Sequence, residues 1–314
     1  MTMYTKFRMA FPAFLLFAAL SLNAADCPLC DAVDMADAEA VKALLAKGVD
    51  LNVKNDANDP ALILAAEKGG ADIVELLLAK KADINIRDGE GETPLLRAVS
   101  MGNWEVAKLL VKKGADVNAA DKLKRTALQT AARKDNMEIF QLLIDKKADV
   151  NAQDADGNTA LINAADQLNE KMIQILLKKK AAVSVQNAKG KTPLIAAAAS
   201  ASPALVKLFL AGKADPNPQD AEGKTALMWA ASLDDAVSVK ELLAKKADVS
   251  LKSKKGRTAL SIAAEMGAGE VVKMLLAKGA DPSVKDESGK LAVDYAKEYG
   301  HQKVLELLSP SAPK

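Results

Sequence analysis

Two cysteines are the residues best suited to chemistry in this chain of 314 residues, and only two positions separate them. Cys27 and Cys30 form a C-x-x-C pair, which can be a redox centre, part of a metal site or a local disulfide. A zinc site needs two further ligands, yet the single histidine, His301, stands near the other end of the chain. We predict that the two cysteines form a local disulfide or stay as free thiols. Lipidation of Cys27 and redox catalysis stay open as alternatives.

The remaining side chains do not assemble into a recognisable catalytic set. A Ser–His–Asp triad cannot be built around one histidine close to the C-terminal end. The sequence also lacks a glycine-rich phosphate loop and a cluster of metal ligands. We therefore predict that the protein is not an enzyme and that it holds no metal or other cofactor.

The first residues have the pattern of a secretory signal peptide. Lys6 and Arg8 precede an apolar run that ends in small residues at Ala24 and Ala25. The run is short for a membrane span, and a buried N-terminal helix, the alternative, does not fit the pattern of the rest of the chain. We predict a signal peptide over residues 1–24, cleavage near Ala24, and a periplasmic or secreted protein without a stable membrane span.

The charge balance argues against a nucleic-acid partner. The chain has 43 basic and 41 acidic side chains, and loss of the signal peptide would remove two basic ones. Proteins that bind nucleic acid generally need a basic excess facing the phosphates. The predicted partner is therefore another protein.

A 33-residue repeat organises everything after the N-terminal segment. The threonines that mark it are Thr93, Thr126, Thr159, Thr192, Thr225 and Thr258. Such a period indicates stacked units, each too small to bury its own apolar face. The repeat therefore predicts one elongated domain that offers a long contact surface.

Each unit follows one plan of two short helices. A Thr-Pro-Leu or Thr-Ala-Leu start, as at Thr192, predicts an N-cap and a first helix with a pair of small residues inside it. A turn leads to a second helix with an apolar stripe, as over 73–78. Lysines end that helix, and an Asp-x-x-Gly turn, as at Asp220 to Gly223, precedes the next unit.

This pattern resembles the ankyrin repeat family, whose units read D-x-x-G-x-T-P-L, then two helices and G-A-D-V-N. The resemblance implies an all-α solenoid of about nine units, each a helix-turn-helix with a β-turn finger, and a monomeric scaffold that binds proteins. It divides residues 25–314 into an N-terminal capping repeat over 25–54, seven full repeats over 55–285, and a C-terminal capping repeat and tail over 286–314.

Several positions depart from the family pattern. The glycine expected after the second helix is replaced by lysine in five units, at Lys81, Lys147, Lys180, Lys213 and Lys246. This position needs a left-handed backbone, which strains a residue with a Cβ. We therefore expect these lysines to be local weaknesses of the fold.

In this family, partners usually contact the finger tips and the inner helix surface. The finger candidates are acidic at Asp88, Glu90 and Glu92 and basic at Lys252, Lys254, Lys255 and Arg257. The helix candidates are Met101, Arg133, Lys134, Leu233, Met266 and Tyr299. Opposite charges at the two ends would orient a partner, although charged tips also occur on ordinary solvated turns. Trp229 and Tyr295 fall one position inward, where burial between repeats is predicted.

The resemblance favours a non-enzymatic scaffold for protein binding outside the cytoplasm. An alternative from a different class is an accessory factor that protects or matures an exported enzyme, for instance by delivering haem. His301 would be the candidate haem ligand, but it occupies a position where the family pattern itself often has histidine.

Overall fold

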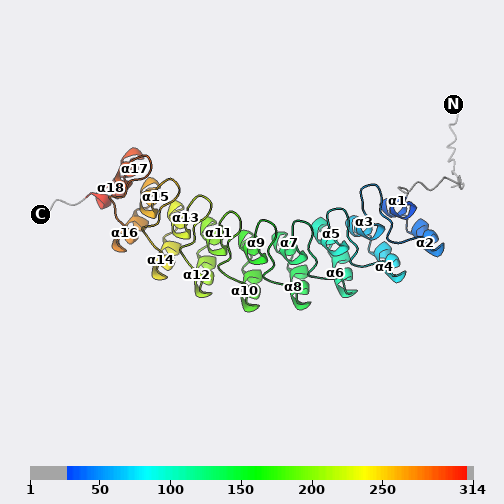
Figure 1. Cartoon of the computed structure of the whole chain (residues 1–314). Coiled ribbons are helices and arrows are strands. Elements are labelled where there is room, and N and C mark those ends of the chain that lie inside the picture. Colours follow the sequence, from blue (N-terminus) through cyan, green and yellow to red (C-terminus); the bar gives the residue numbers. More distant parts are fainter. Residues whose placement is uncertain (1–26, 310–314) are drawn as a thin grey trace, which may run out of the picture.

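The protein is an elongated, curved array of paired helices. A computed structural model describes residues 27–309, which contain eighteen α-helices and, over that range, no strand beyond two isolated bridges. The odd-numbered helices lie in one row and the even-numbered helices in another, and both ends of the array rise toward the odd-numbered row (Figure 1). The predicted all-α solenoid of nine helix pairs is confirmed. The predicted signal peptide lies outside the described residues.

The helix pairs are numbered here as repeats 1 to 9 from the N-terminal end. The inner helices are α1 (Pro28–Asp34), α3 (Ala61–Lys68), α5 (Pro94–Met101), α7 (Ala127–Arg133), α9 (Ala160–Asp166), α11 (Pro193–Ala199), α13 (Ala226–Ser232), α15 (Ala259–Glu265) and α17 (Ala292–Glu298). The outer helices are α2 (Ala38–Ala46), α4 (Ala71–Ala79), α6 (Trp104–Lys112), α8 (Met137–Asp145), α10 (Glu170–Lys178), α12 (Pro203–Ala211), α14 (Ala236–Ala244), α16 (Gly269–Ala277) and α18 (Gln302–Leu308).

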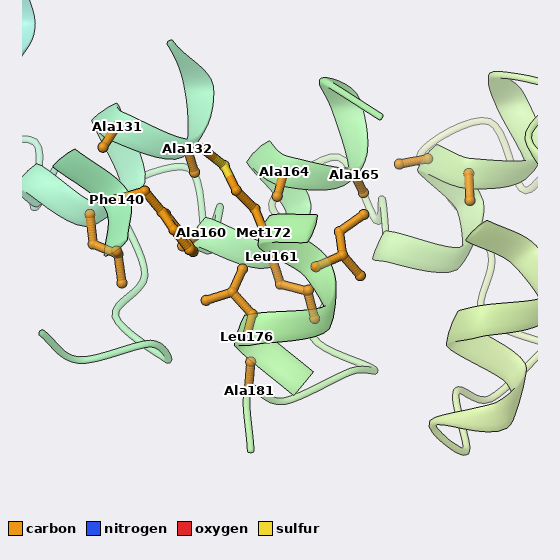
Figure 2. Packing of buried hydrophobic residues seen from close by; sticks show 14 of the residues in the cluster. Ala131, Ala132, Phe140, Ala160, Leu161, Ala164, Ala165, Met172, Leu176 and Ala181 are labelled. Atoms are coloured by element: carbon orange, nitrogen blue, oxygen red, sulfur yellow. The ribbon is translucent and has the colours of Figure 1, made fainter. Parts of the chain in front are cut away.

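Small side chains let neighbouring inner helices pack closely. Ala131 and Ala132 of α7 and Ala164 and Ala165 of α9 are all fully buried, and they form a row that runs across both helices (Figure 2). Longer side chains of the outer helices, such as Met172 of α10, fill the space beneath them. The core is therefore a continuous apolar strip that runs the length of the array, and no repeat holds a core of its own.

Two rows of hydrogen bonds join neighbouring repeats over most of the array. At the finger tips, backbone N–H groups donate to carbonyls of the preceding finger over 2.7 to 3.1 Å, in the pairs Lys122–Glu90, Ala155–Leu123, Ala188–Asp156, Ala221–Lys189, Lys254–Glu222 and Glu287–Lys255. After the outer helices, five side chains accept from the backbone 31 residues later, namely Asn85, Asn118, Asn151, Ser184 and Asn217. Polar contacts therefore fix the spacing of the repeats at both edges of the apolar strip.

Finger glycines make the finger row possible. Gly223 has a φ of +73°, and a Cβ there would lie 2.7 Å from the backbone nitrogen of Lys254 in the next finger. Gly289 has a similar φ of +76°, but a Cβ there would meet nothing within 4 Å. The two positions share the left-handed backbone, and only the first also needs glycine for close approach.

We expect Gly223→Ala to destabilise the array more than Gly289→Ala. The control change should cost about 1 kcal/mol, the usual penalty for a left-handed residue with a Cβ. Gly223→Ala should cost about 2 kcal/mol or more, because it also pushes two fingers apart. Urea unfolding of both variants measures the difference, and equal losses would contradict the role given to the finger row.

The left-handed conformation predicted for the five helix-ending lysines is confirmed. Lys81, Lys147, Lys180, Lys213 and Lys246 have φ between 63° and 67°, and Gly48, Gly114 and Gly279 occupy the same position in other repeats. The N–H groups of these residues cap the outer helices, as that of Lys147 does by donating to Ile144 over 3.0 Å. Each lysine therefore keeps this helix cap by adopting a strained, left-handed backbone conformation.

Lys147→Gly should therefore stabilise the protein, by less than about 1 kcal/mol, because glycine relieves the strain but gains freedom in the unfolded chain. Lys146→Gly is the matched control, since Lys146 has a φ of −86° and carries no such strain. The control should lose stability. In urea unfolding, a loss of stability in both variants would show that Lys147 is not strained.

Candidate functional site

Three adjoining hollows form a groove on the side of the inner helices. We call it the inner groove, and it runs across the fingers and inner helices of repeats 5 to 8. Its two larger hollows have cavity volumes of about 300 Å³ around Trp229 and about 460 Å³ around Met266. They share Ala221 and Glu222 as a common wall, and the Trp229 hollow shares Lys191 with a third hollow toward repeat 5. The groove is therefore continuous over several repeats.

Trp229 is placed by the finger that precedes its helix. Its indole Nε1 donates to Oδ2 of Asp220 over 2.8 Å, and the ammonium group of Lys224 lies 4.1 Å from the ring centroid. The same contact across nine residues joins Asp286 to Tyr295 and Asp88 to Arg97. Each contact joins a finger to its inner helix, and we call it a latch. Tyr295 is buried, as predicted, whereas Trp229 is half-buried and lines the groove.

The Asp286–Tyr295 latch shifts the pKa of both groups. Burial raises the pKa of the Tyr295 hydroxyl, and its hydrogen bond to Asp286 raises it further. Burial also acts to raise the pKa of Asp286, but hydrogen bonds from Tyr295 and from the backbone of Lys290 and Ser288 outweigh it, so that the pKa is lowered. Both shifts favour the charged carboxylate and the neutral phenol at neutral pH.

A line of basic residues occupies the position just before the cap of successive inner helices, and its first three members border the groove. It consists of Lys191, Lys224, Arg257 and Lys290, one in each of repeats 6 to 9. Each is paired with a carboxylate over 2.5 to 2.9 Å, namely Asp166, Glu222, Glu265 and Glu298 in that order. The fold therefore already neutralises this line. Of these four residues, only Arg257 was predicted as a contact from the sequence, although the 33-residue spacing of the basic positions could have revealed the others.

The basic finger tips are different, because their ammonium groups have no partner. Lys189 borders the Trp229 hollow, and Lys254 and Lys255 border the Met266 hollow. All three are exposed, as is Lys252. Across residues 27–309, the structure gives none of these four side chains an ion pair or hydrogen bond. They are charges that the fold leaves open to a partner.

The structure brings some of the predicted contact residues together. Lys254, Lys255, Arg257 and Met266 all line the Met266 hollow. Leu233, Met266 and Tyr299 end three consecutive inner helices at the same repeat position and are 46%, 46% and 54% exposed. Together these residues combine a basic edge with an exposed apolar stripe, which is the mark of a partner surface.

The other predicted contact residues lie in repeats 3 and 4, away from the groove. Met101 is 52% exposed at the end of α5, and Arg133 and Lys134 are exposed at the end of α7. None of the three lines the hollows described above. They stay predictions as partner contacts.

The acidic finger corrects one sequence-based expectation. Asp88 is only 6% exposed, because its carboxylate accepts the backbone N–H groups of Glu90 and Glu92 and pairs with Arg97 over 2.6 Å. Glu92 is also half-buried and pairs with Arg97 over 2.6 Å. Of the three predicted acidic contacts, only Glu90 is exposed. Asp88 and Glu92 therefore stabilise the fold. The residue that pairs with both of them, Arg97, was not predicted from the sequence.

Arg97 lies among four carboxylates, those of Asp59, Glu67, Asp88 and Glu92. Burial acts to lower the pKa of the guanidinium, but hydrogen bonds and charges from Asp88, Glu92 and Glu67 outweigh it and raise the pKa. Asp59 is the most distant, at 3.7 Å. Burial raises its pKa more than Arg97 lowers it, and the nearby Asp88 and Glu67 add to the rise.

The two cysteines and the single histidine make contacts that stabilise the fold. Cys27 and Cys30 are joined by a disulfide, and both are buried at the start of α1. Thiol exchange needs access for an attacking thiolate, which this burial limits. His301 is half-buried, and its Nε2 lies 2.9 Å from the carbonyl oxygen of Glu265. In the described part of the chain, no group of three or more His, Cys, Asp or Glu side chains could hold a metal ion.

Comparison with known families agrees with this architecture. A family model described as ankyrin repeats (3 copies) matches residues 29–121, 118–187, 168–253, 194–286 and 234–313. The chain belongs to the ankyrin-repeat family. Ankyrin repeats form protein–protein interaction domains and are generally scaffolds rather than enzymes. None of the curated proteins compared with the chain matched it. Among residues 27–309, no helix of this ankyrin array is long and apolar enough to cross a membrane.

Asp59→Asn should stabilise this ankyrin array at neutral pH. A carboxyl group whose folded pKa lies above its unfolded value destabilises the fold once it is ionised. Folding stability therefore begins to fall as the pH rises above the ordinary pKa of Asp, and the fall is complete above the raised pKa of Asp59. The variant should therefore unfold at a higher urea concentration at pH 7, by less than about 1 kcal/mol, and the gain should vanish near pH 3.

Asp88→Asn is the contrasting variant. Asp88 holds Arg97 and two backbone N–H groups, so its loss should destabilise the protein by about 1 to 3 kcal/mol. An Asp59→Asn variant that is less stable than the parent at pH 7 would mean that its attraction to Arg97 outweighs its burial.

Proposed function

We propose that this protein is an exported ankyrin scaffold that binds another protein through its inner groove and the neighbouring finger tips. The observation that carries the proposal is the group of side chains that the fold does not use. Lys254 and Lys255 have no partner in the described chain, Met266 is an exposed apolar group in the same hollow, and Leu233 is exposed at the end of the neighbouring inner helix. Exposed apolar surface rimmed by unpaired charge is what a protein interface needs.

Two observations support export. The pattern of residues 1–24 is that of a secretory signal peptide. The disulfide between Cys27 and Cys30 suits an oxidising compartment such as the periplasm or the cell exterior. We infer that the mature protein acts there.

The proposed binding surface can be tested with the double variant Lys254→Glu and Lys255→Glu. Affinity capture with residues 25–314 as bait identifies the partner, and titration then measures its affinity for parent and variant. The variant should bind about tenfold or more weakly at low salt, and the difference should shrink as salt rises, because exposed charges are screened over about 10 Å at 0.1 M.

The matched control is Lys112→Glu with Lys113→Glu, which changes the net charge equally at the end of the outer helix α6. It should leave the affinity unchanged. Equal weakening by both variants would mean that only the net charge matters, and unchanged affinity of the first would place the site elsewhere on the array. Urea unfolding of both variants checks that their stability stays within about 0.5 kcal/mol of the parent.

Export has its own test. The protein is isolated from the envelope and culture medium of the cells that make it, and its N-terminus is sequenced. We expect a mature chain that begins near Ala25. A protein with Met1 intact in the cytoplasmic fraction would contradict export without affecting the proposed binding surface.

A further inference from the structure

We propose that the inner groove of repeats 6 to 8 takes an acidic, extended polypeptide segment that also carries apolar side chains. The inference rests on the proposed function and deepens it by naming the chemistry of the partner segment. The charged groups that line the groove fall into two classes, those that the fold already pairs and those that it leaves open.

The carboxylates that line the Trp229 and Met266 hollows are all engaged. Their partners are Lys191 for Asp166, Trp229 for Asp220, Lys224 for Glu222 and Arg257 for Glu265. In contrast, Lys189, Lys254 and Lys255 have no side-chain partner within residues 27–309. These two hollows therefore present three open positive charges and no comparable open negative charge, and Asp156, whose carboxylate has no partner among residues 27–309, lines only the third hollow toward repeat 5. A partner that brings carboxylates to the finger tips complements this arrangement.

The apolar parts of the groove define where other side chains of the segment would bind. The Trp229 hollow is lined by Ile195 and Ala196 as well as the indole ring, and the Met266 hollow is lined by Ile262. The two hollows belong to successive repeats and share one wall. One continuous segment can therefore place an apolar side chain in each hollow and point its carboxylates toward the lysines, since alternate side chains of an extended chain face opposite sides.

A nucleic acid fits this groove less well than an acidic polypeptide, although it too is negatively charged. Its phosphates recur at every nucleotide, so some would lie against Asp220, Glu222 and Glu265, which line the same hollows. A polypeptide carries carboxylates only where its sequence places them. It can therefore pair with the three lysines and avoid the acidic side chains.

Trp229 provides a direct readout of binding in the groove. The chain has two tryptophans, and Trp104→Phe leaves Trp229 as the only one. The probe is a short synthetic peptide of alternating Glu and Leu residues, titrated at low salt while Trp229 fluorescence is recorded. Its matched controls replace Glu by Gln, Glu by Lys, or Leu by Ser, and a single-stranded oligothymidine tests for nucleic acid.

We expect the Glu–Leu peptide to change Trp229 fluorescence and to bind about tenfold or more tightly than each control peptide. Lys254→Glu with Lys255→Glu should abolish this preference, and Lys112→Glu with Lys113→Glu should preserve it. A Glu–Leu peptide that binds no better than the Gln or Lys peptide would overturn the proposal. Tighter binding of the oligonucleotide would overturn it too and assign the groove to nucleic acid.

The captured partner separates this inference from the proposed function. If the partner binds the inner groove through a neutral or basic segment, the inference fails while the protein-binding function stands. If no protein is captured and the Lys254→Glu, Lys255→Glu variant behaves as the parent does with every peptide, both fail.

Discussion

The close approach of neighbouring repeats is the constraint on which the rest of this structure depends. No helix pair has an interior of its own, so its apolar side chains can leave water only against the next pair. The fully buried alanines of the inner helices and the finger glycines are the residues that allow this approach. A larger side chain at either place would push two repeats apart and lose both the apolar contact and the finger hydrogen bonds.

This constraint also determines where function can be located. Positions that stack are confined to small or apolar residues. Turn positions with a left-handed backbone favour glycine. The side chains that remain free to vary are those of the finger tips and the exposed ends of the inner helices. In repeats 6 to 8 these positions combine unpaired lysines with exposed apolar groups around two hollows. The acidic finger of repeat 3 instead holds Arg97 with Asp88, the fixed Asp of its turn, and with Glu92, a variable position.

Much of the fold could be predicted from the sequence, because the repeat places the same physical requirement at the same position many times. The left-handed lysines are an example, since Gly114 and Gly279 show what conformation the shared position needs. The pairing of charges could not be predicted in this way. Asp88 is the fixed Asp of its finger turn and accepts two backbone N–H groups, as the corresponding Asp220 does, so its burial follows from repeat position. Its ion pair with Arg97 does not, because Trp229 and Tyr295 stand at the position of Arg97 in other repeats.

The inner groove was also predicted only in part, because part of it depends on contacts between particular side chains. Its basic finger and Met266 were expected from the positions that partners of this family usually contact. The hollow around Trp229 was not, because it forms between residues of adjacent repeats and depends on how far the indole reaches toward Asp220. Burial between repeats was the expectation for a large aromatic residue at that position. The structure shows that the hydrogen bond to the finger holds the ring at the groove instead.

We propose that stacking builds a single partner surface on the inner side of repeats 5 to 8. Amide hydrogen exchange of the protein, free and bound to its captured partner, tests this most directly because it reports along the whole chain. We predict that binding adds protection in the fingers and inner helices between residues 156 and 266 and leaves the outer helices unchanged. Added protection confined to the outer helices, or to repeats 1 to 3, would contradict the account.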